Sequence, residues 1–323
     1  MAGDDMRIDD LFHVNHVIEH FGPAIEWYDR VLTPVYMYER HESDVDHRTA
    51  AMTLVADVPI EVMAPHPGPV GRDGNIGTFL HRFGQGFHGL AFYSDTIPEA
   101  FERWRSAGIK VAGDGGGAID APPARGSILT HPRQTYGLVQ LMTPRVGGKG
   151  GTGVGDGLGD CYDPRLLGAH DPLAWLDHPL GIVRGSHITV LVDDIDRASQ
   201  VYVDAFAATR LTEAASGVGA VDSLLTYVGN NTIIELARPH PGSEEQDSLE
   251  RDGGKVWAVT FEVLDLERAR EHLTAVDCAP VQLDEVTIAI PAERALGARY
   301  RFREGAVPGD PRPAPDRSTT SAG

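Results

Sequence analysis

The pattern of apolar and polar residues along this chain predicts the same order of strands and helices four times. Each recurrence begins with a strand pattern, at residues 12–21, 87–94, 185–194 and 255–265. A segment with apolar residues at helical spacing follows each time, at 22–32, 97–108, 195–206 and 266–276. Short alternating segments come next and predict antiparallel strands, as at 48–55, 59–63, 137–142, 223–228 and 232–237. The predicted unit is β-α-β-β-β, occurring four times.

These four units predict an α+β protein of two tandem domains, each a pair of units. The first domain is expected at residues 11–143 and the second at 172–303. Residues 144–171 are glycine-rich and predict a flexible linker. Residues 304–323 are rich in Pro, Ser and Gly and predict a disordered tail.

Charge and cysteine content narrow the class of partner. The formal net charge is −19, so phosphate-rich nucleic acids and anionic membranes would be repelled. Neither Cys161 nor Cys278 lies in a CxxC motif, which is typical of a reducing compartment. No apolar stretch reaches the ~18 residues of a membrane span. We expect a cytoplasmic protein, monomer or homodimer, with a small-molecule substrate.

Polar residues interrupt the predicted core strands at matching places. His16 and His88 lie in the first strands of units one and two. Glu61 follows His16 by 45 residues and Gln140 follows His88 by 52, each in the last strand of its unit. Burying such groups without partners costs several kcal/mol. These four residues therefore predict one site for a divalent metal (Co, Mn, Ni, Zn or Fe); the alternative is four separate core polar groups.

The second domain repeats this pattern in part. His187 and Glu235 match His16 and Glu61, but Trp257 stands at the place of His88 and Tyr300 at that of Gln140. Tryptophan cannot bind a metal, and one His with one Glu is rarely enough. We expect a degenerate copy without metal.

The stretches "NHVIEHFGPAIEWYDRVL" with "IEVMAP", and "FHGLAFYSDTIPEAFERWRSAGIKV" with "GLVQLM", resemble the vicinal oxygen chelate (VOC) superfamily of glyoxalase, bleomycin-resistance and dioxygenase type. The resemblance covers all four units and implies that His16, Glu61, His88 and Gln140 are the metal ligands. The N-terminal half is most similar to methylmalonyl-CoA epimerase, in "NIGTFLHRFGQGFHGLAFYSDTI" and "THPRQTYGLVQL". That family has Gln and Glu in the reverse order, and Gln140 cannot serve as its second acid/base.

The resemblance implies an isomerase- or epimerase-type enzyme that acts through a metal-stabilised enolate on a carbonyl or acyl-CoA substrate. Glu61 is the first candidate base and His131 the second; the alternative for His131 is a turn residue that caps a strand. Two other functions stay open: an Fe(II)-dependent extradiol-type dioxygenase of an aromatic compound, and a non-catalytic, resistance-type binding protein.

Overall fold

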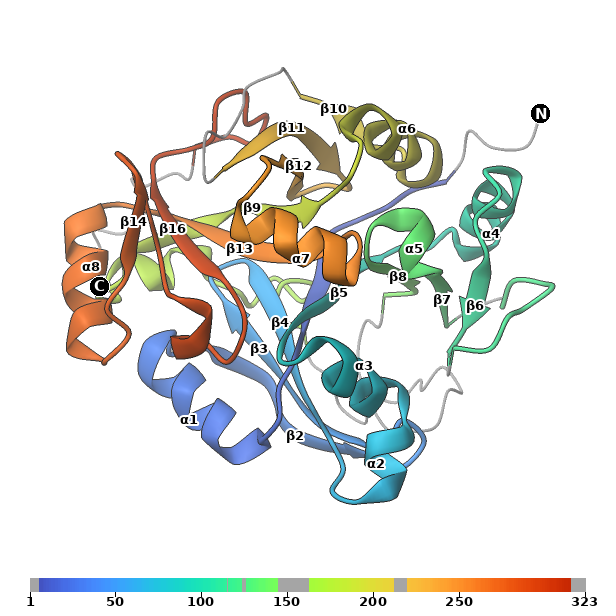
Figure 1. Ribbon diagram of the computed structural model, residues 1–323, viewed down its shortest axis with the longest axis horizontal. Coiled ribbons are helices and arrows are strands. Elements are labelled where there is room, and N and C mark those ends of the chain that lie inside the picture. Colours follow the sequence, from blue (N-terminus) through green and yellow to red (C-terminus); the bar gives the residue numbers. More distant parts are fainter. Residues whose placement is uncertain (1–5, 115, 124–125, 145–162, 212–219, 315–323) are drawn as a thin grey trace.

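A computed structural model describes all residues except 1–5, 115, 124–125, 145–162, 212–219 and 315–323 (Figure 1). The elements of the first half are β1 (Leu11–Val17), α1 (Phe21–Val31), β2 (Val35–Ser43), β3 (Arg48–Val55), β4 (Val58–Pro65), α2 (Pro69–Asp73), α3 (Asn75–Phe83), β5 (Gly86–Tyr93), α4 (Ile97–Ser106), β6 (Val111–Gly113), β7 (Ser127–Thr130), α5 (Pro132–Thr135) and β8 (Leu138–Met142). Those of the second half are η1 (Pro172–Leu176), β9 (Ile182–Leu191), α6 (Ile195–Phe206), β10 (Thr209–Arg210), β11 (Val221–Val228), β12 (Thr232–Pro239), α7 (Glu244–Asp252), β13 (Lys255–Val263), α8 (Leu266–Ala275), β14 (Val281–Asp284), β15 (Thr287–Ala289), η2 (Ala292–Arg294) and β16 (Tyr300–Glu304). In the described part of the chain, no helix is both long enough and apolar enough to cross a membrane.

The strands form two eight-stranded sheets with the same topology. The first has the order β2-β3-β4-β1-β5-β8-β7-β6 and the second β10-β11-β12-β9-β13-β16-β15-β14. In each, the first and last strands of a unit pair in parallel, and the two first strands pair antiparallel at the centre. This confirms the α+β class and four βαβββ units paired into two.

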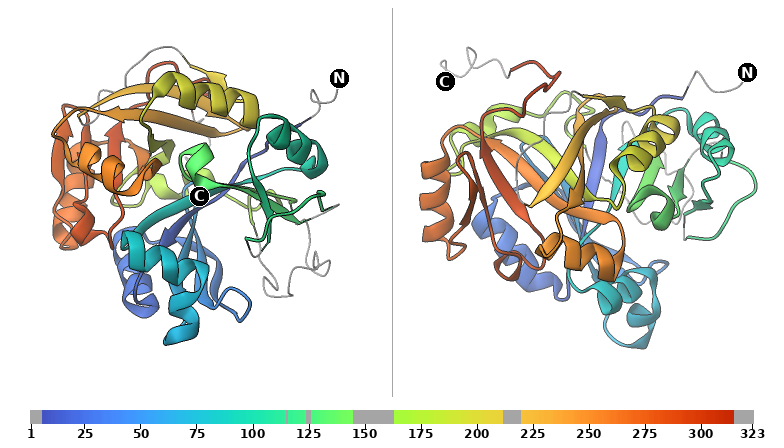
Figure 2. Two further views of the ribbon diagram at one scale, coloured as in Figure 1. Left: turned by 45° about the vertical axis from the view of Figure 1, so that its right-hand side comes forward. Right: turned by 45° about the horizontal axis from the view of Figure 1, so that its top comes forward.

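One face of each sheet belongs to a core that both halves share. Val14 and Leu90 of the first sheet lie in one apolar cluster with Ile188 and Val259 of the second. Helices join this core: α4 lies beside α6, where Trp104 donates a hydrogen bond to a carbonyl of the second half (2.9 Å), and α8 lies beside α1 (Figures 1 and 2). The opposite faces point away from the shared core. We call them the N cup, which carries Asn15 and Glu61, and the C cup, which carries Thr189 and Glu235.

The two sheets are related residue by residue. Asn15 pairs with Glu61 across β1 and β4, as Thr189 pairs with Glu235 across β9 and β12. Both members of the second pair follow those of the first by 174 residues (189 − 15 and 235 − 61). This constant offset makes His13 the counterpart of His187.

The interface between the halves has the same pseudo-two-fold symmetry. The backbone N–H of Leu11 donates to Asn231 Oδ1 (3.0 Å), and that of Gly185 donates to Asp57 Oδ1 (2.5 Å). Gly185 and Asn231 are the counterparts of Leu11 and Asp57 at the offset of 174 residues. The halves therefore contact each other as two subunits of a symmetric dimer would.

A repeated Asp-Pro-Arg segment fastens the end of each half, and it corrects two expectations. Arg165 is bound to Asp163 and donates to the carbonyls of Leu11 (2.8 Å) and Asp57 (3.2 Å). This part of the predicted linker is packed, whereas residues 145–162 lie outside the described residues.

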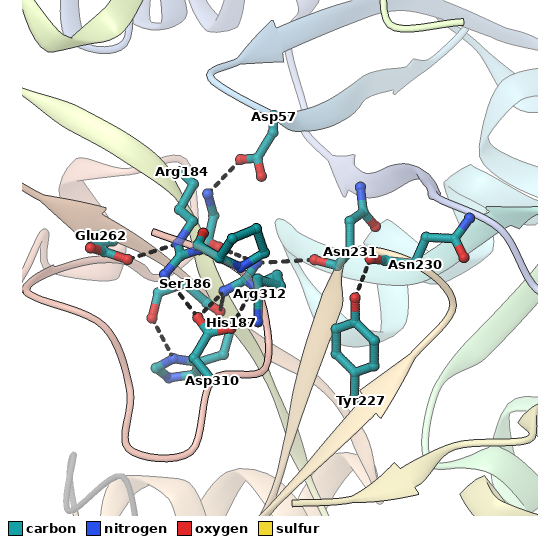
Figure 3. A network of polar contacts seen from close by, with 12 residues as sticks. Asp57, Arg184, Ser186, His187, Tyr227, Asn230, Asn231, Glu262, Asp310 and Arg312 are labelled. Carbon is teal, nitrogen blue, oxygen red and sulfur yellow. Dashed lines mark hydrogen bonds and ion pairs between the residues drawn. The ribbon is translucent and has the colours of Figure 1, made fainter. Parts of the chain in front are cut away.

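Arg312 repeats the arrangement in the second half, because it is bound to Asp310 and donates to the carbonyls of Gly185 (2.8 Å) and Asn231 (3.0 Å) (Figure 3). The predicted tail is therefore fixed to the sheet at Asp310 and Arg312, so disorder was the wrong prediction for this part of it. Residues 315–323 lie outside the described part.

Candidate active site in the N cup

Glu61 is the most heavily bonded side chain of the N cup. Its Oε1 accepts from Arg48 Nη1 (2.8 Å) and from the Tyr38 hydroxyl (2.9 Å), and its Oε2 accepts from Asn15 Nδ2 (3.0 Å). Burial favours the neutral acid, but the charge of Arg48 and the hydrogen bonds from Arg48 and Tyr38 hold the pKa of Glu61 below its usual range. The cup therefore contains a buried carboxylate.

His13 lies next to this carboxylate. The ring is 3 % exposed, and its Nε2 is 3.5 Å from Glu61 Oε2. Neither ring nitrogen forms a hydrogen bond within the described chain. Burial lowers the pKa of His13 to about 4, so the imidazole is neutral at physiological pH. A buried ring with both nitrogens unsatisfied is costly and indicates a missing partner.

His88 reaches the cup from a β-bulge. Asn15 of β1 pairs with Gly89 of β5, and the next residue, His16, pairs with Phe87. His88 between them has no partner on β1 and is therefore the extra residue of the bulge. Its ring packs on Phe79 of α3, with 4.5 Å between the ring centroids. Burial and the charge of Arg48 lower the pKa of His88 to about 4, although the negative charge of Glu61 acts in the opposite direction.

Gln140 lies on the same face. It pairs in register with Ala91, which pairs in turn with His13, and paired residues share a face. Its Nε2 donates to Ser127 Oγ (2.9 Å). Strands β4, β1, β5 and β8 are consecutive in the sheet, and each contributes one of Glu61, His13, His88 and Gln140.

His16 is on the opposite face, so its predicted place beside the other three residues is wrong. Its Nε2 donates to the carbonyl of Leu296 (3.0 Å), and its Nδ1 accepts from the Tyr28 hydroxyl (2.7 Å). Tyr28 is also 2.6 Å from the hydroxyl of Tyr300. Side chains three apart in a strand face opposite ways, which separates His16 from His13. Sequence spacing could have shown this, because 48 residues separate His13 from Glu61 and also His187 from Glu235.

His131, the second candidate base, has a structural role. It is exposed and caps α5, where its Nδ1 accepts from the backbone N–H of Arg133 (3.3 Å). His131 is thus a turn residue, as in the alternative weighed from the sequence, but it caps a helix rather than a strand.

The C cup lacks the set of possible metal ligands that the N cup has. His187 Nε2 is 3.6 Å from Glu235 Oε2, as in the N cup, but the bulged residue of β13 is Trp257. The counterpart of Gln140 is Arg301, because Arg301 pairs with Thr260 as Gln140 pairs with Ala91. The expectation that Tyr300 takes this place is wrong, since it faces the shared core and bonds to Tyr28.

The N-cup residues match a divalent metal in donor type. Two neutral imidazoles, a carboxylate and an amide oxygen are typical ligands of Zn, Fe, Mn or Co. The unsatisfied ring of His13 marks where such an ion would bind. As the side chains stand, the described residues contain no group of three or more His, Cys, Asp or Glu arranged to hold a metal. Binding would require Glu61 to exchange Arg48, Tyr38 or Asn15 for the ion.

Comparison with known proteins agrees with this fold. A family model described as the Glyoxalase/Bleomycin resistance protein/Dioxygenase superfamily matches residues 186–288. No curated protein sequence matches the chain.

Solved structures extend the likeness to both halves. A mutant of 4-hydroxymandelate synthase from Streptomyces coelicolor is 16% identical, with a TM-score of 0.61 over 93% of this chain and 94% of its own. The 2,3-dioxygenase LapB from Pseudomonas is 12% identical, with a TM-score of 0.52 over 93% and 92%. Methylmalonyl-CoA epimerase from Mycobacterium tuberculosis is 23% identical over 42% of this chain and 89% of its own, but its TM-score of 0.35 is too low to argue from. The chain thus has the two-domain fold of these proteins, and its residues 186–288 match the glyoxalase/bleomycin resistance protein/dioxygenase superfamily.

Proposed function

We propose that the N cup is the active site of a divalent-metal-dependent enzyme whose ligands are His13, Glu61, His88 and Gln140. The observation that carries this proposal is the buried imidazole of His13, which has no hydrogen bond and lies 3.5 Å from the Glu61 carboxylate. The C cup holds no equivalent ion, because Trp257 and Arg301 replace the third and fourth ligands. The expected content is one metal per chain.

The reaction we propose is an isomerase-type proton transfer next to the carbonyl of a small carbonyl or acyl-CoA substrate. The bound ion would supply positive charge for the substrate oxygen. Glu61 is ionised and buried, so it attracts the cation, and Tyr38 and Arg48 fix the direction of its carboxylate. The imidazoles of His13 and His88 are neutral and need lose no proton to bind a metal.

A matched pair of variants tests the ligand set. His13→Ala should lower metal affinity by at least about 100-fold, because losing even an outer-sphere partner costs 10- to 100-fold. His16→Gln, three residues along the same strand but on the other face, should keep the metal. Metal content and affinity are measured on protein purified without chelator. Equal affinity in parent and His13→Ala, or a parent without metal, contradicts the proposal; the latter points to the resistance-type binder.

An Fe(II)-dependent dioxygenase is the second candidate. Two histidines and one carboxylate are the ligand set of non-haem Fe(II) oxygenases. Two of the solved structures that span both halves are named as a 4-hydroxymandelate synthase and a 2,3-dioxygenase. The assignment of His131 as a cap also leaves the isomerase without its second base.

Two measurements distinguish the reactions. Metal-loaded protein is incubated with acyl-CoA or 2-oxo substrates in heavy water under argon, and exchange at the α-carbon is followed. Exchange that is lost in Glu61→Gln supports the isomerase. Oxygen uptake with catechol-like compounds and Fe(II), without such exchange, supports the dioxygenase.

A further inference from the structure

Three arginines alternate along the last strand of the C cup. Arg299 directly precedes β16, and Arg301 and Arg303 lie within it. Side chains two apart in a strand share a face, whereas Tyr300 and Phe302 between them enter the shared core. In a chain of net charge −19, this places a row of guanidinium groups on one face of one sheet.

Buried polar atoms without partners gather on this same face. Within the described residues they include donor groups of Trp257 (Nε1), Arg301 (Nη1) and Arg303 (Nε) and the hydroxyls of Thr260 and Thr287. Cross-strand pairing of Thr260 with Arg301, and of Thr287 with Arg303, puts these residues side by side. Indole and guanidinium nitrogens can only donate, so the missing partner must be an acceptor.

Carboxylates neutralise much of this positive charge, because Arg299 is paired with Glu244 and the charges of Glu235 and Glu245 act on Arg301. Arg301 is 4 % exposed, and Glu245 lies 3.9 Å from its Nη2. Burial lowers the pKa of Arg301, and the charges of Glu235 and Glu245 oppose this effect. A buried guanidinium with an unsatisfied N–H is stabilised most by a charge-assisted bond to an oxyanion.

A cleft between the two halves touches this face at Trp257 and Arg299, whereas Arg301 and Arg303 do not line it. Its volume is about 320 Å³, and Trp257, Lys255 and Arg299 of the second half line it opposite Phe79 of α3. The Arg299 guanidinium lies 3.4 Å from the centre of the Trp257 ring and Lys255 Nζ lies 5.4 Å from it. The lining thus combines flat ring surface with cations that are themselves ion-paired, Arg299 with Glu244 and Lys255 with Asp252, and the volume suits a small organic molecule.

We propose that the C cup is a metal-free binding site for a small organic anion, whose carboxylate or phosphate group is held by Arg301, Arg303 and the indole N–H of Trp257. In this half a guanidinium stands where the N cup has a candidate metal ligand, so the two cups bind oxygen-bearing ligands by different means. The flat apolar part of the ligand lies in the cleft beside Trp257 and Phe79. This site is independent of the metal proposed for the N cup.

Binding of two probes, benzoate and inorganic phosphate, tests the site by calorimetry and tryptophan fluorescence on the full chain. Arg301→Met should weaken binding by about 10-fold or more, because it removes a charged hydrogen-bond donor. Trp257→Phe keeps the ring but loses the N–H, and should weaken binding severalfold. Arg238→Met, at an exposed arginine of the same half, should bind as the parent does. The preferred probe identifies the carboxylate or the phosphate as the bound group.

His13→Ala separates the two cups, because it should lose metal and keep the anion, while Arg301→Met should do the reverse. The proposal is overturned if neither probe binds the parent at concentrations up to about 10 mM, because a specific site should bind more tightly than that. It is overturned equally if Arg301→Met and Trp257→Phe bind as tightly as the parent. Should Arg301→Met fail to fold, the Trp257→Phe result decides.

Discussion

At the scale of single residues, the buried histidines are of two kinds. His16 has both nitrogens in hydrogen bonds, one to Tyr28 and one across the interface to Leu296. His13 in the N cup has neither nitrogen bonded within the described chain. A satisfied ring contributes to stability, whereas an unsatisfied one costs stability, and this cost is the reason why we propose a ligand at His13.

His16 gives the molecule a pH-dependent stability. Burial lowers its folded-state pKa to about 4, below the ordinary value of about 6.5. As the pH falls, the unfolded chain therefore takes up a proton at His16 before the folded chain does. The free energy of unfolding is unaffected by this proton above about pH 6.5, and it decreases from there toward pH 4 by up to about 1.4 kcal/mol per pH unit. His16→Gln should flatten this part of the profile, measured by urea unfolding from pH 7 to pH 4. An unchanged slope in the variant would show that His16 does not titrate on unfolding.

The sequence placed three of the four N-cup residues correctly on one face. Glu61, His88 and Gln140 could be predicted because each interrupts an apolar strand at a repeated position. The error at His16 arose because "HVNH" offers two histidines on opposite faces of one strand. A β-bulge at His88 also breaks simple alternation, and a single sequence does not show a bulge.

At the scale of elements, each half ends in an Asp-Pro-Arg segment whose arginine bonds to the first strand of that half. We call this arrangement the clasp. Arg165 and Arg312 bond to the carbonyls of counterpart residues, Leu11 and Gly185. The helices and strands were predictable from periodicity, and α6 occupies the predicted 195–206. The clasps could not be predicted in this way. Their Pro- and Gly-rich composition argued for disorder, and the partners of the two arginines are backbone carbonyls distant in sequence.

Loss of the second clasp should destabilise the protein strongly. Arg312→Ala would leave Asp310 with only Arg184 and would free three carbonyls, those of Gly185, Ser186 and Asn231. Breaking a buried pair costs about 3–5 kcal/mol, so the free energy of unfolding should fall by that amount. Arg238→Ala, which breaks an exposed pair, should have no measurable effect. A chemical-denaturation series checks both; equal stability of the two variants would mean that the tail does not hold the sheet.

At the scale of the whole molecule, the two halves form one body. Their apolar residues belong to one core cluster, and reciprocal bonds join counterpart residues across the interface. Two fused units thus supply the pairing that separate copies would supply in a dimer. The repeated units could be read from the sequence, but the symmetry of their contact depends on distant loops that periodicity does not describe.

A glycine at this interface tests whether the halves unfold together. At Gly185, a Cβ atom would lie 2.3 Å from Val58 Cγ2 of the other half, and valine has little rotamer freedom to move away. Gly185→Ala should therefore cost about 1–3 kcal/mol through overpacking. Gly22→Ala, where a Cβ meets nothing within 4 Å, is the matched control and should not destabilise the protein. Because the core is shared, urea unfolding of Gly185→Ala should remain one transition at a lower midpoint, coincident by tryptophan fluorescence and circular dichroism. Two separate transitions in the parent would show instead that the halves unfold independently.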